Sequence, residues 1–89
     1  MSKKLALVTG ASRGLGAEIA LRLSKDGFHV AINYASNAEK AKEVLARIER
    51  AGGSGELTPF DVSNSKSIDE AIDALTGKHG AVHTLVNNA

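Results

Sequence analysis

Short apolar runs alternate with amphipathic stretches along the whole chain. The apolar runs are rich in strand-forming residues, and the amphipathic stretches repeat their apolar residues at helical spacing. We expect strands at residues 4–9, 28–33, 55–60 and 82–87. We expect helices at residues 14–26, 37–50 and 63–76. Successive strands start about 25 residues apart with a helix between each pair, which is typical of a parallel α/β protein.

The order of the strands follows from this alternation and from one proline. Parallel strands joined by helices require right-handed crossover connections. Pro59 lies inside the third strand and cannot donate a ladder hydrogen bond, so this strand belongs at an edge. We therefore predict an α/β fold: a partial Rossmann-type, doubly wound parallel sheet of strand order 3-2-1-4 in three αβα layers. The first two helices cover one face and the third covers the other, and ligands bind between strands one and four.

Composition restricts the chain to one small domain and removes several classes of site. Its 89 residues are 43% hydrophobic and 24% charged, which is ordinary for a globular protein. A net charge of +1 without a basic block gives no case for a nucleic-acid partner. The absence of cysteine excludes disulfides, thiolate catalysis and zinc–cysteine sites. The N-terminal apolar run is too short for a signal peptide, and no stretch approaches membrane-spanning length, so we expect a cytoplasmic protein without a membrane partner.

The segment after the first strand is rich in glycine. Gly10, Gly14 and Gly16 follow the spacing G-x-x-x-G-x-G, whereas the usual dinucleotide fingerprint is G-x-G-x-x-G. The first two let the backbone turn tightly and approach a ligand, and the third lets the helix pack close to the strand. The amide groups and the positive helix dipole at such a turn suit a pyrophosphate. An ordinary strand-to-helix turn is the alternative interpretation.

Four short motifs occur in order along the chain. Residues 9–16 read TGASRGLG, Asp61 and Val62 follow the third strand, residues 85–86 read LV, and residues 87–89 read NNA. Together they resemble the cofactor-binding signature of the short-chain dehydrogenase/reductase family. The resemblance implies that the chain binds a nicotinamide dinucleotide. The cofactor-binding candidates are Gly10, Ser12, Arg13, Gly14, Leu15, Gly16, Asn33, Tyr34, Ser36, Asp61, Val62 and Asn88.

The resemblance also implies individual roles at the ends of the third and fourth strands. Asp61 would accept a hydrogen bond from the adenine amino group, the amide of Val62 would meet a ring nitrogen, and Asn88 would lie against a ribose. Asn87 would tie the central sheet together. From the residues alone, Asp61 could instead cap the following helix, and the asparagines could be simple turn residues.

The end of the second strand bears on the choice of dinucleotide. Proteins that prefer NAD carry an acidic residue there, but here the first acid is Glu39, inside the predicted helix. Arg13 is long enough to reach a 2′-phosphate, and Ser36 or Asn37 could add a neutral donor. We therefore predict NADP(H) in preference to NAD(H). A solvated loop arginine is the alternative interpretation of Arg13.

The family reaction uses a serine, a tyrosine and a lysine, the last two in a Tyr-x-x-x-Lys motif. The only tyrosine is Tyr34, and Ala38 stands four residues later, so we predict no catalytic residue in this chain. In the family the catalytic residues follow the fourth strand. We expect residues 1–89 to be the N-terminal dinucleotide-binding portion of a longer protein, inactive and marginally stable alone, and either self-associated or held by the remainder. A homo-oligomer is the expected state.

The motifs are most similar to those of bacterial 3-oxoacyl-(acyl-carrier-protein) reductases of fatty acid synthesis. This similarity implies that the parent transfers hydride from NADPH to a β-keto acyl thioester and has acyl-carrier protein as a partner. Sugar dehydrogenases and small carbonyl reductases share the pattern. A non-catalytic nucleotide-binding module, or a structural half-fold, is the alternative.

The three histidines, His29, His79 and His83, have no mutual spacing typical of a metal site. We predict that they are ordinary strand or helix-end residues and that the chain has no metal centre.

Overall fold

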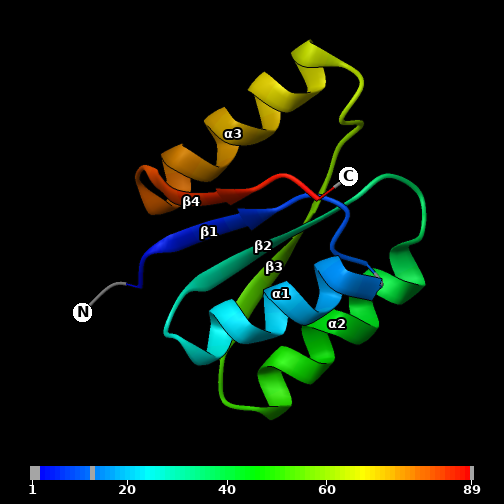
Figure 1. Ribbon diagram of the computed structural model, residues 1–89. Helices are drawn as coiled ribbons and strands as arrows, with labels where there is room; N and C mark the ends of the chain where they lie inside the picture. The colour runs from blue at the N-terminus through cyan, green and yellow to red at the C-terminus, as the bar shows by residue number, and fades with distance from the viewer. Residues whose placement is uncertain (1–2, 13, 89) are drawn as a thin grey trace.

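A four-stranded parallel sheet forms the middle layer of the molecule (Figure 1). The structure is a computed structural model and describes residues 3–12 and 14–88. Its strands are β1 (Leu5–Val8), β2 (His29–Tyr34), β3 (Ser54–Pro59) and β4 (Val82–Val86). Its helices are α1 (Gly14–Lys25), α2 (Ala38–Arg50) and α3 (Ser65–His79). The strand order is β3-β2-β1-β4, which confirms the predicted fold class.

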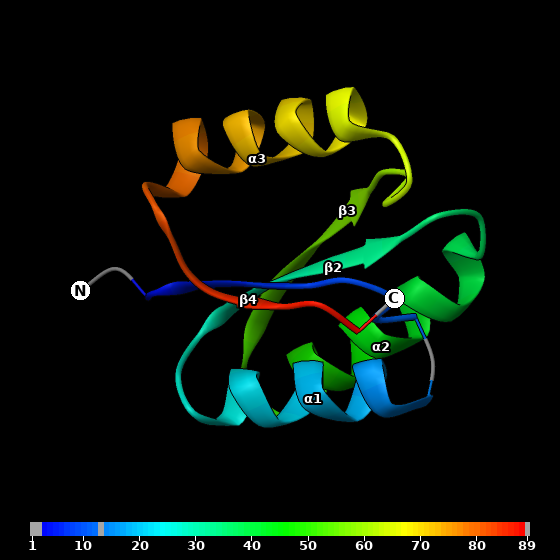
Figure 2. The ribbon, with the colours of Figure 1, turned by 45° about the horizontal axis from the view of Figure 1, so that its top comes forward.

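Helices cover both faces of the sheet (Figure 2), and each face carries its own apolar core. Val8, Val30 and Ile32 pack with α1 and α2 on one face. Leu5 and Leu7 pack with α3 on the other, because successive side chains of a strand point to opposite faces. The predicted placement of the helices is therefore confirmed, and the sheet is held from both sides.

Pro59 is the last residue of β3, and β3 lies at one edge of the sheet. Its partner in the register is Tyr34 at the end of β2. The edge position predicted from this proline is confirmed.

The predicted bounds of the third helix are wrong at both ends. The helix starts at Ser65, because Asn64 caps it by accepting a hydrogen bond from the amide of Ser67. Asp61 is therefore not the cap of this helix. At the other end the helix continues through Gly77 to His79 and stops at Gly80, whose φ of 84° is accessible to glycine.

One apolar side chain of the fourth strand lies outside the cores. Leu85 is 58% exposed, whereas Leu7, its partner in the register of β1, is 1% exposed. On the face that carries α3, the leucines of β1 are covered and the exposure falls on β4. Among the described residues, no helix combines the length and apolar character needed to cross a bilayer.

Candidate functional site

The turn from β1 into α1 is built around glycines at positions where a side chain would be either strained by the backbone conformation or crowded by neighbouring atoms. Gly10 and Gly14 have φ values of 60° and 61°, a region that side chains disfavour. A Cβ added to Gly16 would lie 2.3 Å from the carbonyl oxygen of Gly10. The helix therefore approaches the turn as closely as backbone atoms allow, as predicted for Gly16.

The segment after β4 is hydrogen-bonded to this turn. The amide of Asn88 donates to the Thr9 hydroxyl at 2.9 Å, and the side-chain amide Nδ2 of Asn88 donates to the Gly10 carbonyl at 3.2 Å. The Thr9 amide donates to the Val86 carbonyl at 3.0 Å. Two segments almost eighty residues apart in sequence thus meet at the carboxyl edge of the sheet, where the predicted topology places a ligand crevice. Asn87 takes part, with its Oδ1 3.4 Å from the Thr9 hydroxyl.

Asn33 connects the turn to the other strands from inside the sheet. Its side chain is part of a residue only 2% exposed, and its Oδ1 accepts from the amide of Gly10 at 3.1 Å. Its Nδ2 donates to the carbonyl groups of Thr58 and Phe60, both at 3.2 Å. The amide of Ala11 donates to the Asn33 carbonyl at 2.9 Å. These bonds engage the side-chain amide of Asn33 with backbone groups of the turn and of the segment around β3. The side chain is therefore buried in the sheet and does not face a ligand.

The other candidates near the end of β2 are more accessible. Tyr34 is partly buried and packs against the core under α1 and α2, whereas Ser36 is exposed. Asn37 caps α2 by accepting from the amide of Lys40 at 3.1 Å. Glu39 lies in the first turn of α2 and forms an ion pair with Lys42, with 3.9 Å between Oε1 and Nζ. The first carboxylate after β2 therefore lies on the exposed surface of α2 and not at the end of the strand.

Asp61 and Val62 lie at the same edge, after β3. The Asp61 carboxylate accepts from the Ser63 hydroxyl at 2.7 Å and from the Ser63 amide at 2.9 Å. These two hydrogen bonds hold the pKa of the Asp61 carboxyl below its ordinary value of 3.8. The carboxylate is exposed and ionised at neutral pH, so it can still accept a further hydrogen bond from a ligand.

Two large apolar side chains are exposed in the segments that follow β1 and β3. Leu15, in the first turn of α1, is 70% exposed, and Val62 is 40% exposed. Both were predicted from the sequence to contact a cofactor. Exposed apolar groups beside hydrogen-bonding groups are typical of sites that bind a flat, partly polar ligand. Ser12 completes the described part of the turn, and Arg13 lies outside the described residues.

A separate cavity of about 710 Å³ lies between α1 and α2. Ser12 and Gly14 reach it from the turn, and Lys40 and Arg47 line it from α2. Asp61 and Asn88 do not line it. The predicted residues that follow β1, β3 and β4 lie at the carboxyl edge of the sheet, and of these only the turn after β1 borders the cavity.

A second polar cluster lies toward the amino-terminal ends of the strands, away from the carboxyl edge. It was not predicted from the sequence. His29 opens β2, Glu56 lies in β3 and His79 ends α3. Partial burial raises the pKa of the Glu56 carboxyl, but hydrogen bonds from His29, Lys78 and His79 outweigh it and lower the pKa to about 2. The histidines are strand and helix-end residues, as predicted. Their spacing gave no signal because three separate elements bring the cluster together.

Comparison with known proteins points to one family. The family model described as short chain dehydrogenase matches residues 4–89. A crystal structure of a dehydrogenase/reductase from Sinorhizobium meliloti superposes with a TM-score of 0.93 at 40% identity. That superposition covers 100% of this chain and 35% of the other.

Three curated relatives have similar identities, each over 86 residues and 97% of this chain. The 3-oxoacyl-(acyl-carrier-protein) reductase FabG of Staphylococcus epidermidis is 42% identical, and the match covers 35% of it. The 3beta-hydroxysteroid dehydrogenase 1 of Eggerthella lenta is also 42% identical, with 33% covered. The short-chain dehydrogenase/reductase homolog YusS of Bacillus subtilis is 40% identical, with 79% covered. The chain thus spans about a third of two of these relatives and most of the third.

Proposed function

The chain belongs to the short-chain dehydrogenase family, and from this premise we propose that the carboxyl edge of its sheet binds NADP(H) in preference to NAD(H). The family consists of oxidoreductases that bind nicotinamide dinucleotides. The observation that carries the proposal is the pair of hydrogen bonds from Asn88 to Thr9 and Gly10. They bring the glycine turn and the segment after β4 to one place, which a dinucleotide would span.

The donor set at the turn fits a pyrophosphate. The first amide groups of an α-helix have no carbonyl acceptor within the helix, and in α1 these belong to the turn that begins at Gly14. The absence of a Cβ at Gly16 keeps the helix end close to the carbonyl of Gly10. The turn would therefore hold the two phosphates by backbone amides and by the helix dipole.

The adenosine end of the cofactor would lie towards β2 and β3. We propose that the Asp61 carboxylate accepts from the adenine amino group, that the Val62 amide donates to the ring, and that the Val62 side chain packs on it. Asn88 would lie against the ribose next to the nicotinamide. Asn33 has a positioning role, since its amide is bonded to the backbone of the turn and of the segment around β3.

The preference for NADP(H) rests on the chemistry at the end of β2. A carboxylate there would repel a 2′-phosphate, but the first carboxylate after β2 is Glu39, which lies in the first turn of α2. Ser36 is exposed at this point and can donate a hydrogen bond. Arg13, from the turn, would supply the positive charge. The cofactor supplies or accepts the hydride, and the residues of this chain bind and orient it.

For the whole protein we propose reduction of a 3-oxoacyl thioester carried by acyl-carrier protein. This is supported by the 42% identity with the Staphylococcus reductase and by the sequence motifs. Hydroxysteroid dehydrogenase activity is the second candidate, because the hydroxysteroid dehydrogenase of Eggerthella lenta matches this chain at the same identity. Assay of the whole protein with a 3-oxoacyl thioester and with a 3-oxosteroid would separate the two candidates.

Titration of the ¹⁵N-labelled chain with NADP⁺, followed by NMR, tests the binding site. We expect amide shifts at Gly14, Leu15, Val62 and Asn88. Shifts confined to residues of the α1–α2 cavity, such as Lys40 and Arg47, would place the ligand there and overturn the assignment. An absence of shifts at all of these positions, at cofactor concentrations that saturate family members, would overturn the proposal itself.

A further inference from the structure

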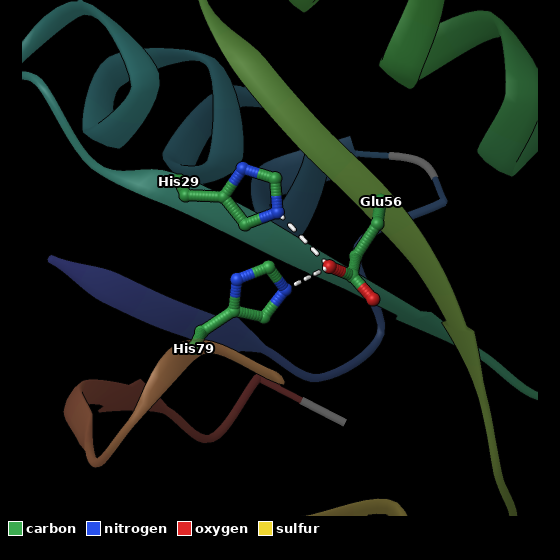
Figure 3. Close-up of side chains that lie close together, drawn as sticks. All are labelled: His29, Glu56 and His79. Atoms are coloured by element: carbon green, nitrogen blue, oxygen red, sulfur yellow. Dashed lines mark hydrogen bonds and ion pairs between the residues drawn. The ribbon is translucent and has the colours of Figure 1, made fainter. Parts of the chain in front are cut away.

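Two histidines and a glutamate converge at the amino-terminal edge of the sheet (Figure 3). His29 Nε2 lies 3.0 Å from Glu56 Oε1, and His79 Nε2 lies 2.5 Å from the same oxygen. The two imidazole rings are tilted against each other, with centroids 4.6 Å apart. The side chains point toward one another from β2, β3 and α3, so three elements share one polar centre.

We propose that His29, Glu56 and His79 form a binding site for a divalent transition-metal ion, with Zn²⁺ as the best-fitting ion. Two imidazole nitrogens and one carboxylate oxygen are a donor set that zinc accepts, with the fourth position left to water. The three ligand atoms lie within 4.8 Å of one another. Tetrahedral zinc needs its ligand atoms about 3.3 Å apart, which rotation of these side chains can reach.

A hydrogen bond behind His29 supports the ligand assignment. Its Nδ1 lies 2.9 Å from the Ser54 hydroxyl oxygen. If Nδ1 carries the proton and donates it to Ser54, the lone pair of Nε2 points at the centre of the cluster. Histidine ligands commonly donate their second ring N–H in this way, and the bond fixes both the tautomer and the orientation of the ring.

The charges around the site permit a cation but weaken its binding. Lys78 Nζ lies 3.0 Å from Glu56 Oε2, so it engages the carboxylate oxygen that the histidines do not contact. Lys3 and Lys78 both line a cavity of about 300 Å³ that also includes His29 and His79. This cavity gives an ion an entry path and leaves room for the water that completes the coordination.

A bound ion would restrain the carboxyl-terminal end of α3. Among the described residues, α3 is the only helix on its face of the sheet, and His79 is its last residue. A metal bond from His79 to β2 and β3 would hold the helix end to the sheet. An ion that binds only the folded state raises the stability of the fold in proportion to the logarithm of its concentration.

The test uses the full chain without an affinity tag, titrated with Zn²⁺ by calorimetry and with Co²⁺ by visible absorption. We expect one ion per chain, intense tetrahedral Co²⁺ bands and a Tm that rises with Zn²⁺. His79→Ala and Glu56→Gln should both abolish the Co²⁺ bands. Ser54→Ala should weaken Zn²⁺ binding by about 10- to 100-fold, since it removes the partner of a ligand.

His83→Ala is the matched control, because His83 is exposed on β4 and its ring nitrogen contacts the neighbouring Thr84. This variant should bind as the original chain does. Circular dichroism of each variant establishes that it is folded, and His79→Gln replaces His79→Ala if the latter is not. Failure of the original chain to bind Zn²⁺ would show an ion-pair cluster only. Binding that survives both His79→Gln and Glu56→Gln would place the ion elsewhere, and either result overturns the proposal.

Discussion

The side-chain amide of Asn88 donates to the carbonyl of Gly10 across 3.2 Å, which ties the end of the described chain to the first turn. Gly16 lies against both partners. A Cβ added there would be 2.3 Å from the Gly10 oxygen and 2.6 Å from Asn88 Nδ2. This contact explains why the third glycine of the motif belongs to the packing of the site, although it stands inside a helix where glycine is otherwise unfavourable.

Replacement of Gly16 by alanine should therefore destabilise the fold in spite of the better helix propensity of alanine. We expect a loss of about 1–3 kcal/mol in the free energy of unfolding, as for other overpacked sites, measured by urea denaturation. Gly77→Ala is the matched control, since Gly77 is also helical and a Cβ there meets nothing within 4 Å. It should gain about 0.4–1 kcal/mol. Equal effects of the two substitutions would contradict the close approach.

Substitution of Asn33 should have the largest effect among the asparagines of the site. Asn33→Ala leaves the partly buried Gly10 amide and the buried carbonyl groups of Thr58 and Phe60 without this partner. We expect a loss of about 3 kcal/mol, because each unsatisfied buried group costs about 1–3 kcal/mol. Asn37→Ala, which removes only a helix cap, should cost about 1 kcal/mol in the same denaturation assay. A smaller loss for Asn33 than for Asn37 would argue against its buried role.

The alternation of apolar and amphipathic segments was sufficient to predict the strand order and the two-sided helix layers. It works because parallel strands buried on both faces read as short apolar runs, and Pro59 identified the edge. The position of the glycine turn beside Asn88 followed from that topology. The burial of Asn33 did not, since its bonds depend on the register of β2 against β3.

The end of α3 shows where sequence reasoning fails. Gly77 has the low helix propensity typical of a helix end, but α3 continues through it, and a Cβ there would meet no neighbouring atom. Lys78 and His79, which follow it, both contact Glu56. The tertiary contacts extend the helix past a residue of poor propensity. The same extension carries His79 to His29, so the error in the helix end and the missed polar cluster have one cause.

The pH dependence of the turn after β3 follows from Asp61. Hydrogen bonds from Ser63 lower its pKa in the folded chain, so their stabilisation is present above pH 3.8 and is lost as the pH falls through the folded pKa. A ¹³C NMR titration of the Asp61 carboxyl should give a midpoint below 3.8. Ser63→Ala should move this midpoint upward, because the hydroxyl donor is lost. An unchanged midpoint in that variant would show that the hydroxyl does not hold the carboxylate.

Leu85 should govern the association of the chain with itself. It is 58% exposed on β4, an edge strand in the described part of the sheet, and exposed apolar edges favour pairing. Leu85→Lys should shift the chain toward monomer in analytical ultracentrifugation. Val62→Lys, at another exposed apolar position, should leave the association unchanged. If the two variants behave alike, association does not run through β4.

Arg13 should decide between the two nicotinamide dinucleotides. If its guanidinium contacts the 2′-phosphate, Arg13→Ala removes a charge-assisted hydrogen bond of about 1.5–3 kcal/mol, and NADPH affinity should fall by about 10- to 100-fold. NADH lacks this phosphate, so its affinity should change little in the same fluorescence titration. Arg22→Ala is the control, because Arg22 lies in the last turn of α1 and pairs with Asp26 at 3.4 Å. Equal losses for NADPH and NADH in the Arg13 variant would remove the phosphate contact and, with it, the argument for NADP(H).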